Sequence, residues 1–85
     1  MHIELRFFAS VREQLGLSAE SADVPADVTT FGQLRQWLRE RGGAWGEALA
    51  EGRALRMAVD HAVARPDTAL AEGCEVAFFP PVTGG

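Results

Sequence analysis

The chain has 85 residues, of which 47% are hydrophobic and 24% charged, and its formal net charge is −4. This length allows one small domain with a single core and excludes a multidomain enzyme. The negative charge argues against nucleic-acid binding, which needs a basic face, and no apolar stretch approaches the ~20 residues that cross a membrane. We therefore expect a soluble globular protein that binds neither nucleic acid nor a membrane.

The chain begins with a pattern that is typical of a strand with one buried face. From His2 onward, Ile3, Leu5 and Phe7 alternate with polar residues until Phe8 breaks the pattern. We predict a strand here that places its odd-numbered side chains in the core.

A short helical turn is expected next. Ser10 is a candidate N-cap for residues 11–15, and Gly16 is placed to end that turn as its C′ residue. An extended stretch over residues 22–24 can then pair back on the first strand, although its apolar pattern is sparse.

Thr30 and Gln33 form a capping-box pattern and predict the start of the main helix. Four apolar residues recur at helical spacing on one side of it: Phe31, Leu34, Trp37 and Leu38. We expect Arg35, Arg39 and Glu40 to face water.

Gly42-Gly43 ends the main helix in this prediction, and residues 44–50 favour a second, shorter helical segment. Trp37 and Trp45 are expected in or at the edge of the core, not stacked on a ligand.

The remaining segments predict three strands separated by turns. Residues 55–59 alternate, Asp60-His61 forms a tight turn into residues 62–64, and Glu72-Gly73 leads into a buried strand over residues 76–79. The first and last strands should lie side by side and parallel in the middle of the sheet, because the helices supply the crossover that a parallel pair needs. The fold class is therefore α+β, with a mixed sheet of about five strands wrapped around one main helix.

The sequence ends in Pro80-Pro81-Val82-Thr83-Gly84-Gly85, directly after the last predicted strand. The two prolines stop the sheet and stiffen the exit, and the glycines lack a Cβ, so a narrow channel can close around them. Six extended residues span roughly 20 Å. We predict a folded domain over residues 1–79 and an extended tail over residues 80–85 that carries the terminal carboxylate to a partner.

Few other residues suggest chemistry. Cys74 is the only cysteine, which excludes an internal disulfide and a multi-cysteine zinc site, and we expect it to be a packed residue. His2 and His61 have no partners at metal-ligand spacing, so no metal is predicted. The N-terminal residues show no secretory signal, which favours the cytoplasm.

The last thirteen residues, together with Phe7-Phe8-Ala9 and Val11-Arg12-Glu13, closely resemble the small subunits of molybdopterin synthase, the MoaD-type sulfur carriers of the MoaD/ThiS family. The resemblance covers the whole chain and implies the ubiquitin-like β-grasp fold. Cys74 stands where that family usually has aspartate, and Asp60 where asparagine is common.

The resemblance further implies a reaction at the C-terminus. An E1-like adenylyltransferase uses ATP to adenylate the Gly85 carboxylate, a sulfur donor protein converts it to a thiocarboxylate, and the tail delivers sulfur to cyclic pyranopterin monophosphate in molybdenum cofactor biosynthesis. The expected acceptor site belongs to the large subunit of a heterotetramer, and no cofactor is bound by this chain. Gly85 and Gly84 are the expected reacting end, and Phe79, Pro80, Pro81, Val82 and Thr83 the expected partner-binding segment. For Phe79 docking is favoured over packing, and for Phe7 the reverse.

Two alternatives remain open. The same chemistry could serve thiamine synthesis, tRNA thiolation or cysteine synthesis, whose carriers share the fold and the Gly-Gly end. The chain could instead be a ubiquitin-like interaction module that binds without covalent chemistry.

Overall fold

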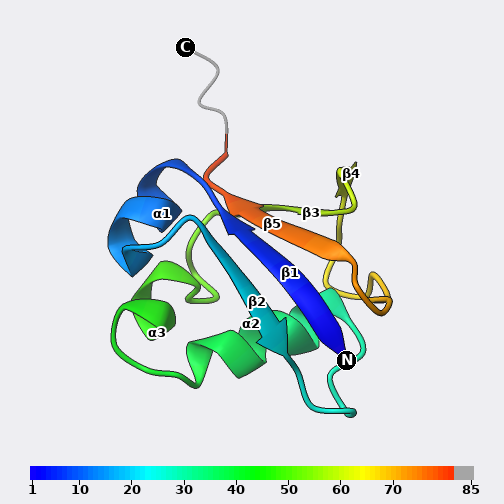
Figure 1. Ribbon diagram of the computed structural model, residues 1–85. Helices are drawn as coiled ribbons and strands as arrows, with labels where there is room; N and C mark the ends of the chain where they lie inside the picture. The colour runs from blue at the N-terminus through cyan, green and yellow to red at the C-terminus, as the bar shows by residue number, and fades with distance from the viewer. Residues whose placement is uncertain (82–85) are drawn as a thin grey trace.

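The computed structural model describes residues 1–81, which form a five-stranded sheet with a helix across one of its faces (Figure 1). The elements are β1 (His2–Phe7), α1 (Ala9–Leu15), β2 (Ala19–Asp23), α2 (Phe31–Arg39), α3 (Ala44–Ala48), β3 (Arg56–Val59), β4 (Ala62–Val63) and β5 (Glu75–Phe79). The strand order is β2-β1-β5-β3-β4, with β1 and β5 parallel and the other pairs antiparallel. The predicted mixed sheet around one main helix is confirmed.

The two central strands are β1 and β5, as the sequence predicts. Leu5 lies opposite Val76 and Phe7 opposite Phe78 in the parallel register. The chain between them supplies α2 and α3, so the crossover that parallel strands need is present. Because β5 is paired on both sides, its C-terminal end leaves from the centre of the sheet.

The core lies between the sheet and α2. Phe78 is fully buried, and its ring centroid lies 5.1 Å from that of Phe31 on α2 and 5.8 Å from that of Phe7 on β1. Each such side chain contributes about 1.5–3 kcal/mol by leaving water. Phe7 also meets Trp45 edge to face, and both Trp37 and Trp45 pack against the core while partly exposed, which confirms their predicted place.

The start of α2 is the predicted capping box. The Thr30 hydroxyl accepts the Gln33 backbone N–H at 3.3 Å, and the Gln33 side-chain oxygen accepts the Thr30 N–H at 3.1 Å. Two otherwise unpaired donors of the first turn are thereby satisfied. The helix ends at Arg39, shortly before Gly42, whose φ is +79°.

The prediction that Ser10 caps the first helix is wrong. The N-cap is Phe8, whose backbone is extended and whose carbonyl accepts the Val11 N–H at 3.1 Å, while its own N–H still bonds Phe78. The helix therefore begins two residues earlier than predicted, at Ala9, whose φ is +51°. Gly16 ends the helix as predicted, with φ +76°.

The prediction that Arg35 faces water is also wrong. Its guanidinium donates hydrogen bonds to the carbonyl oxygens of Leu49 at 2.8 Å, Ala50 at 2.5 Å and Arg53 at 3.4 Å. These carbonyls follow α3, where a helix end leaves acceptors without intrahelical donors. Partial burial lowers the pKa of the Arg35 guanidinium, and the side chain ties α2 to the loop after α3. Arg39 is likewise only partly exposed, whereas Glu40 faces water as predicted.

The predicted turn between β3 and β4 is present. Asp60 and His61 adopt φ values of +49° and +69°, as in the mirror-image turns that suit hairpins. The Asp60 N–H donates to the Glu75 carbonyl at 2.8 Å, and the Asp60 carboxylate accepts the Glu75 N–H at 2.9 Å. An asparagine oxygen can accept the same bond, so aspartate here keeps the start of β5 attached to the turn.

Candidate functional site

The candidate site is the end of β5, where the chain leaves the sheet (Figure 1). Phe79 is the last residue of the strand, and Pro80 and Pro81 follow it in a half-buried position. The prolines end the ladder because they have no N–H to donate. The predicted site residues Val82, Thr83, Gly84 and Gly85 lie outside the described residues, so the tail prediction and the division at residue 79 stay predictions.

Phe79 lies on the face of the sheet opposite α2. Along β5, Val76 and Phe78 are buried on the helix side, and Ala77 and Phe79 alternate onto the open side, where they are half-buried. The Phe79 ring meets the ring of Phe8 edge to face, with centroids 6.5 Å apart, and Phe8 is 48% exposed. The expectation that Phe7 packs is confirmed, because it is 1% exposed.

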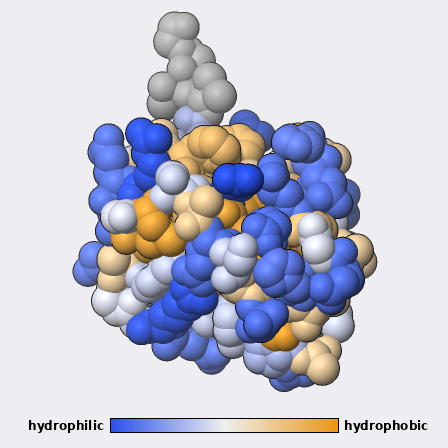
Figure 2. Space-filling model, in the orientation of Figure 1, coloured by the Kyte–Doolittle hydropathy of each residue, from blue (hydrophilic) through white to orange (hydrophobic). Residues whose placement is uncertain are grey.

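Further small and apolar side chains continue this surface across β3 and β4. Ala58 pairs with Ala77, and Val63 pairs with Ala58 and is 82% exposed. The open-face strip consists of these residues: Phe8, Ala58, Val63, Ala77 and Phe79. Figure 2 shows apolar surface at the upper end of the molecule, where β5 ends. A strip of this kind at a chain exit is typical of a docking surface.

Two arginines border the open-face strip. Arg56 lies opposite Phe79 on β3, and Arg6 lies opposite Ala77 on β1, where its Nε is 3.5 Å from a Glu75 carboxylate oxygen. Both arginines are exposed. A partner surface that covers the apolar strip therefore meets positive charge at its rim, which favours an acidic border on that partner.

The sequence did not predict Phe8 or Val63 as parts of this surface. The signal for Phe8 was its place beside Phe7, since adjacent residues of a strand face opposite sides of a sheet. One of the two phenylalanines had to face away from the core. Val63 carried no comparable signal, because the short β4 strand has no alternating pattern long enough to assign a face.

The cysteine and the two histidines are not part of the surface at the end of β5. Cys74 is 3% exposed in the turn before β5, which confirms the prediction of a packed residue. His2 Nε2 lies 2.5 Å from a Glu4 carboxylate oxygen, and this hydrogen bond, aided by Asp23, raises the pKa of His2. Over residues 1–81, no group of three or more His, Cys, Asp or Glu side chains could hold a metal ion.

The described part of the chain offers an exposed apolar surface at the end of β5. None of the helices in residues 1–81 has both the length and the apolar character of a membrane span.

Comparison with known proteins agrees with this arrangement. The model of the ThiS family matches residues 5–85. The molybdopterin synthase sulfur carrier subunit of Escherichia coli K12 is 45% identical over 98% of this chain and 99% of its own length.

Two solved structures have the same fold. SAMP1, the small archaeal modifier protein 1 of Haloferax volcanii, superposes with a TM-score of 0.76 at 26% identity over the full length of both chains. In a complex of subunits 1 and 2 of the molybdopterin-converting factor of Helicobacter pylori, the matching chain superposes with a TM-score of 0.66 at 25% identity, again over both full lengths. The chain therefore belongs to the ThiS family, has its ubiquitin-like β-grasp fold, and is a homologue of the MoaD-type sulfur carrier subunits of molybdopterin synthase.

Proposed function

We propose that this chain is the sulfur-carrying small subunit of a molybdopterin synthase and that its working group is the Gly85 carboxylate. The observation that carries the proposal is the position of β5, the central strand. It leads to Pro80 and Pro81 beside an exposed apolar strip, and these prolines begin the six residues that end in Gly84-Gly85. The full-length similarity to the E. coli sulfur carrier subunit supports the same function.

The chemistry requires activation before sulfur transfer. A C-terminal carboxyl has a pKa near 3.5, so it is anionic at neutral pH and a poor electrophile. An E1-like enzyme joins the Gly85 carboxylate to AMP and releases pyrophosphate from ATP. Hydrosulfide supplied by the donor protein then attacks the acyl carbon, expels AMP and loses its proton, which leaves a thiocarboxylate.

The thiocarboxylate next acts as the nucleophile. Docking of the domain holds it at the acceptor carbon of cyclic pyranopterin monophosphate in the large subunit, which raises its effective concentration. The carbon–sulfur bond forms as a carbon–oxygen bond of the precursor breaks, and hydrolysis of the resulting acyl–sulfur link leaves sulfur on the pterin and returns Gly85 as a carboxylate. The dithiolene product contains two sulfurs, so two charged carriers are consumed for each pterin.

The open-face strip is the proposed docking surface for these steps. The activating enzyme and the large subunit must each receive the same tail, and the strip adjoins the tail exit. The two partners therefore bind one carrier in turn, not together, and two carriers flank a large-subunit dimer in the working heterotetramer. ATP and a reduced sulfur donor place the reaction in the cytoplasm, and the free thiol of Cys74 suits that compartment.

Fragmentation mass spectrometry of the whole chain tests the proposal. The chain is incubated with the activating enzyme of its host, ATP and a sulfur donor, and we expect one oxygen of Gly85 to be replaced by sulfur only when ATP is present. Localisation is needed, because oxidation of Cys74 or a methionine adds nearly the same mass. An unmodified Gly85, under conditions that convert the E. coli carrier, would refute the carrier chemistry and favour a non-covalent interaction module.

A further inference from the structure

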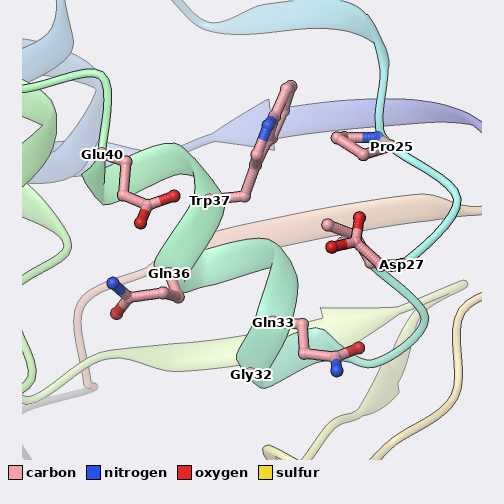
Figure 3. Close-up of a pocket in the computed structure, with 8 residues that line it drawn as sticks. Pro25, Asp27, Gly32, Gln33, Gln36, Trp37 and Glu40 are labelled. Atoms are coloured by element: carbon pink, nitrogen blue, oxygen red, sulfur yellow. The ribbon is translucent and has the colours of Figure 1, made fainter.

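A pocket of about 360 Å³ lies between α2 and the loop that joins β2 to α2 (Figure 3). Asp27 and Val28 line it from the loop, and Gln36, Trp37 and Glu40 line it from the helix. It lies away from the end of β5, because this loop follows the end of β2 that pairs with the start of β1, whereas the end of β5 pairs with the end of β1. The pocket and the open-face strip are therefore separate surfaces.

The lining of the pocket favours a cation. Asp27 and Glu40 are exposed, and among residues 1–81 neither takes part in an ion pair, while no basic residue lines the pocket. The Arg41 guanidinium already lies 5.2 Å from the centroid of the Trp37 ring and 4.4 Å from that of the Trp45 ring. An aromatic ring between two unpaired carboxylates suits an arginine or lysine side chain.

The strand beside the pocket has a free edge. The residues that flank β2, Ser18 and Val24, point their backbone groups at β1. The Phe7 N–H donates to the Ser18 carbonyl, and the Val24 N–H donates to the Met1 carbonyl. By alternation, the N–H and C=O groups of the three intervening odd-numbered residues point outward: Ala19, Ser21 and Asp23. Within the described part of the chain, none of these three amides donates a hydrogen bond. The edge can therefore accept another strand.

An added strand would cover the pocket. Ala22 and Val24 are buried on the helix side of β2, so alternate side chains of a neighbouring strand would also project to that side, towards α2. Near Glu20 the space between β2 and α2 is bridged, because Arg41 donates two hydrogen bonds, of 2.9 and 2.7 Å, to the Glu20 carboxylate.

We propose that the free edge of β2 and this pocket bind an extended segment of a partner protein, which adds to the sheet as a sixth strand and places an arginine or lysine side chain against Asp27, Trp37 and Glu40. A second copy of this chain does not suit the pocket, because it would bring a further net charge of −4 to an acidic surface. The proposal does not rest on the sulfur chemistry, and the segment can bind while the tail occupies another protein.

Nuclear magnetic resonance of the whole ¹⁵N-labelled chain tests this with a blocked seven-residue peptide that alternates valine and arginine. We expect the largest shifts at the amides of Ala19, Ser21 and Asp23 and at the Trp37 indole N–H. A peptide of the same sequence with methylated backbone nitrogens on its pairing side should not bind, and one with glutamate in place of arginine should bind at least about tenfold more weakly.

The variant with Asp27→Asn and Glu40→Gln should also bind the arginine peptide about tenfold more weakly, whereas Glu13→Gln, an exposed change on α1, should bind as the parent does. Equal binding by the double variant, equal binding of the methylated peptide, or shifts confined to the open-face strip would each overturn the proposal. Thiocarboxylate formation at Gly85, measured on the same variants, should be unchanged and distinguishes this result from a failure of the carrier function.

Discussion

The two faces of the sheet are built from alternating residues of the same strands and have opposite properties. On the helix side of the central pair, Ile3, Leu5, Phe7, Val76 and Phe78 are at most 1% exposed. On the open side, the interleaved residues of β1 and β5 are polar near the start of β1 and apolar near the end of β5. Successive side chains of a strand point to opposite faces of the sheet, so burial alternates along the strand and adjacent residues have different roles.

The open face is itself divided. Near the start of β1, the Glu4 carboxylate accepts hydrogen bonds from Ser21 Oγ and lies against His2, which makes a polar network that needs no partner. Near the end of β5, Phe8 and Phe79 contact each other and remain partly exposed. The exposed apolar side chains at the end of β5 indicate docking, and the buried side chains on the helix side indicate folding. The two tasks can therefore be separated by mutation.

The strongest separation comes from the tail. An alanine appended after Gly85 moves the carboxylate one residue along and should reduce thiocarboxylate formation below detection, because the activating site must enclose the terminal glycines. The melting temperature should stay within 1 °C of the parent, roughly, since the added residue lies outside the sheet. Conversion of the extended chain at the parental rate, measured by mass spectrometry, would show that the reaction does not require a glycine at the C-terminus.

Phe78 and Phe79 are neighbours on β5 that face opposite sides, so they form a matched pair. Phe78→Ala should lower the free energy of unfolding by about 3–5 kcal/mol, because it removes a fully buried ring that packs on Phe31 and Phe7. Phe79→Ala should lower it by less than about 1 kcal/mol. Urea denaturation measures both values.

The order reverses for docking. Phe79→Ala should weaken binding to the large subunit about tenfold or more, as expected for an aromatic anchor at an interface. Phe8→Ala should weaken it in the same direction, since its ring contacts Phe79. Calorimetric titration with the folded variants gives the affinities. An unchanged affinity for both would mean that the open-face strip is only surface.

Substitution of Arg35 tests whether its hydrogen bonds hold α2 to the loop after α3. Arg35→Met keeps much of the apolar stem but removes three hydrogen bonds to the carbonyls of Leu49, Ala50 and Arg53, so it should destabilise by about 1–3 kcal/mol. The control Arg12→Met changes an exposed arginine on α1 and should cost less than about 0.5 kcal/mol. If both substitutions lower the free energy of unfolding equally in urea denaturation, the loss comes from the removed charge and not from the hydrogen bonds to the carbonyls.

Thr30 tests the start of the covering helix. Thr30→Ala removes the hydroxyl that accepts the Gln33 N–H and should cost about 1 kcal/mol, or about 4–8 °C in melting temperature for a domain of this size. Thr30→Ser keeps the hydroxyl and should remain close to the parent. A serine variant as unstable as the alanine variant would point to the lost methyl group instead of the cap.

These comparisons also show what the sequence could predict. The strands, the capping box at Thr30 and the parallel central pair follow from local periodicity and from a connection rule, so they are predictable. The place of Arg35 is not, because its partners are carbonyls more than ten residues away that no side-chain pattern reveals. The cap of α1 was misassigned because the ladder to Phe78 holds Phe8 in extended form, and that contact spans 70 residues.

The same limit holds for the candidate site. The Gly-Gly end and the prolines are visible in the sequence, and the alternation along β5 places Phe79 on the other face of the sheet from Phe78. The open-face strip needs β3 and β4 beside β5, and the pocket at Trp37 needs the loop before α2 folded against the helix. Surfaces assembled from distant segments depend on tertiary pairing, which composition and periodicity do not encode.

The polar end of the open face supports the smallest prediction, a pH dependence. Hydrogen bonding to Glu4 raises the pKa of His2 from its ordinary 6.5, so its contribution to stability is full below 6.5 and is lost as the pH rises through the folded value. Hydrogen bonds from Ser21 and His2 lower the pKa of Glu4 from 4.5, so its contribution is present above 4.5 and is lost as the pH falls through the folded value.

Both groups are charged in the window between 4.5 and 6.5, and the pair stabilises most there. His2→Gln should therefore lower the melting temperature more at about pH 5.5 than at about pH 8.5, and raised salt should shrink the difference because both side chains are partly exposed. Ser10→Ala, an exposed change of a residue that does not titrate, is the control, and its effect should be alike at both pH values. A pH-independent loss in the His2 variant would show that the imidazole acts on the open face as a packed ring and not as a charge.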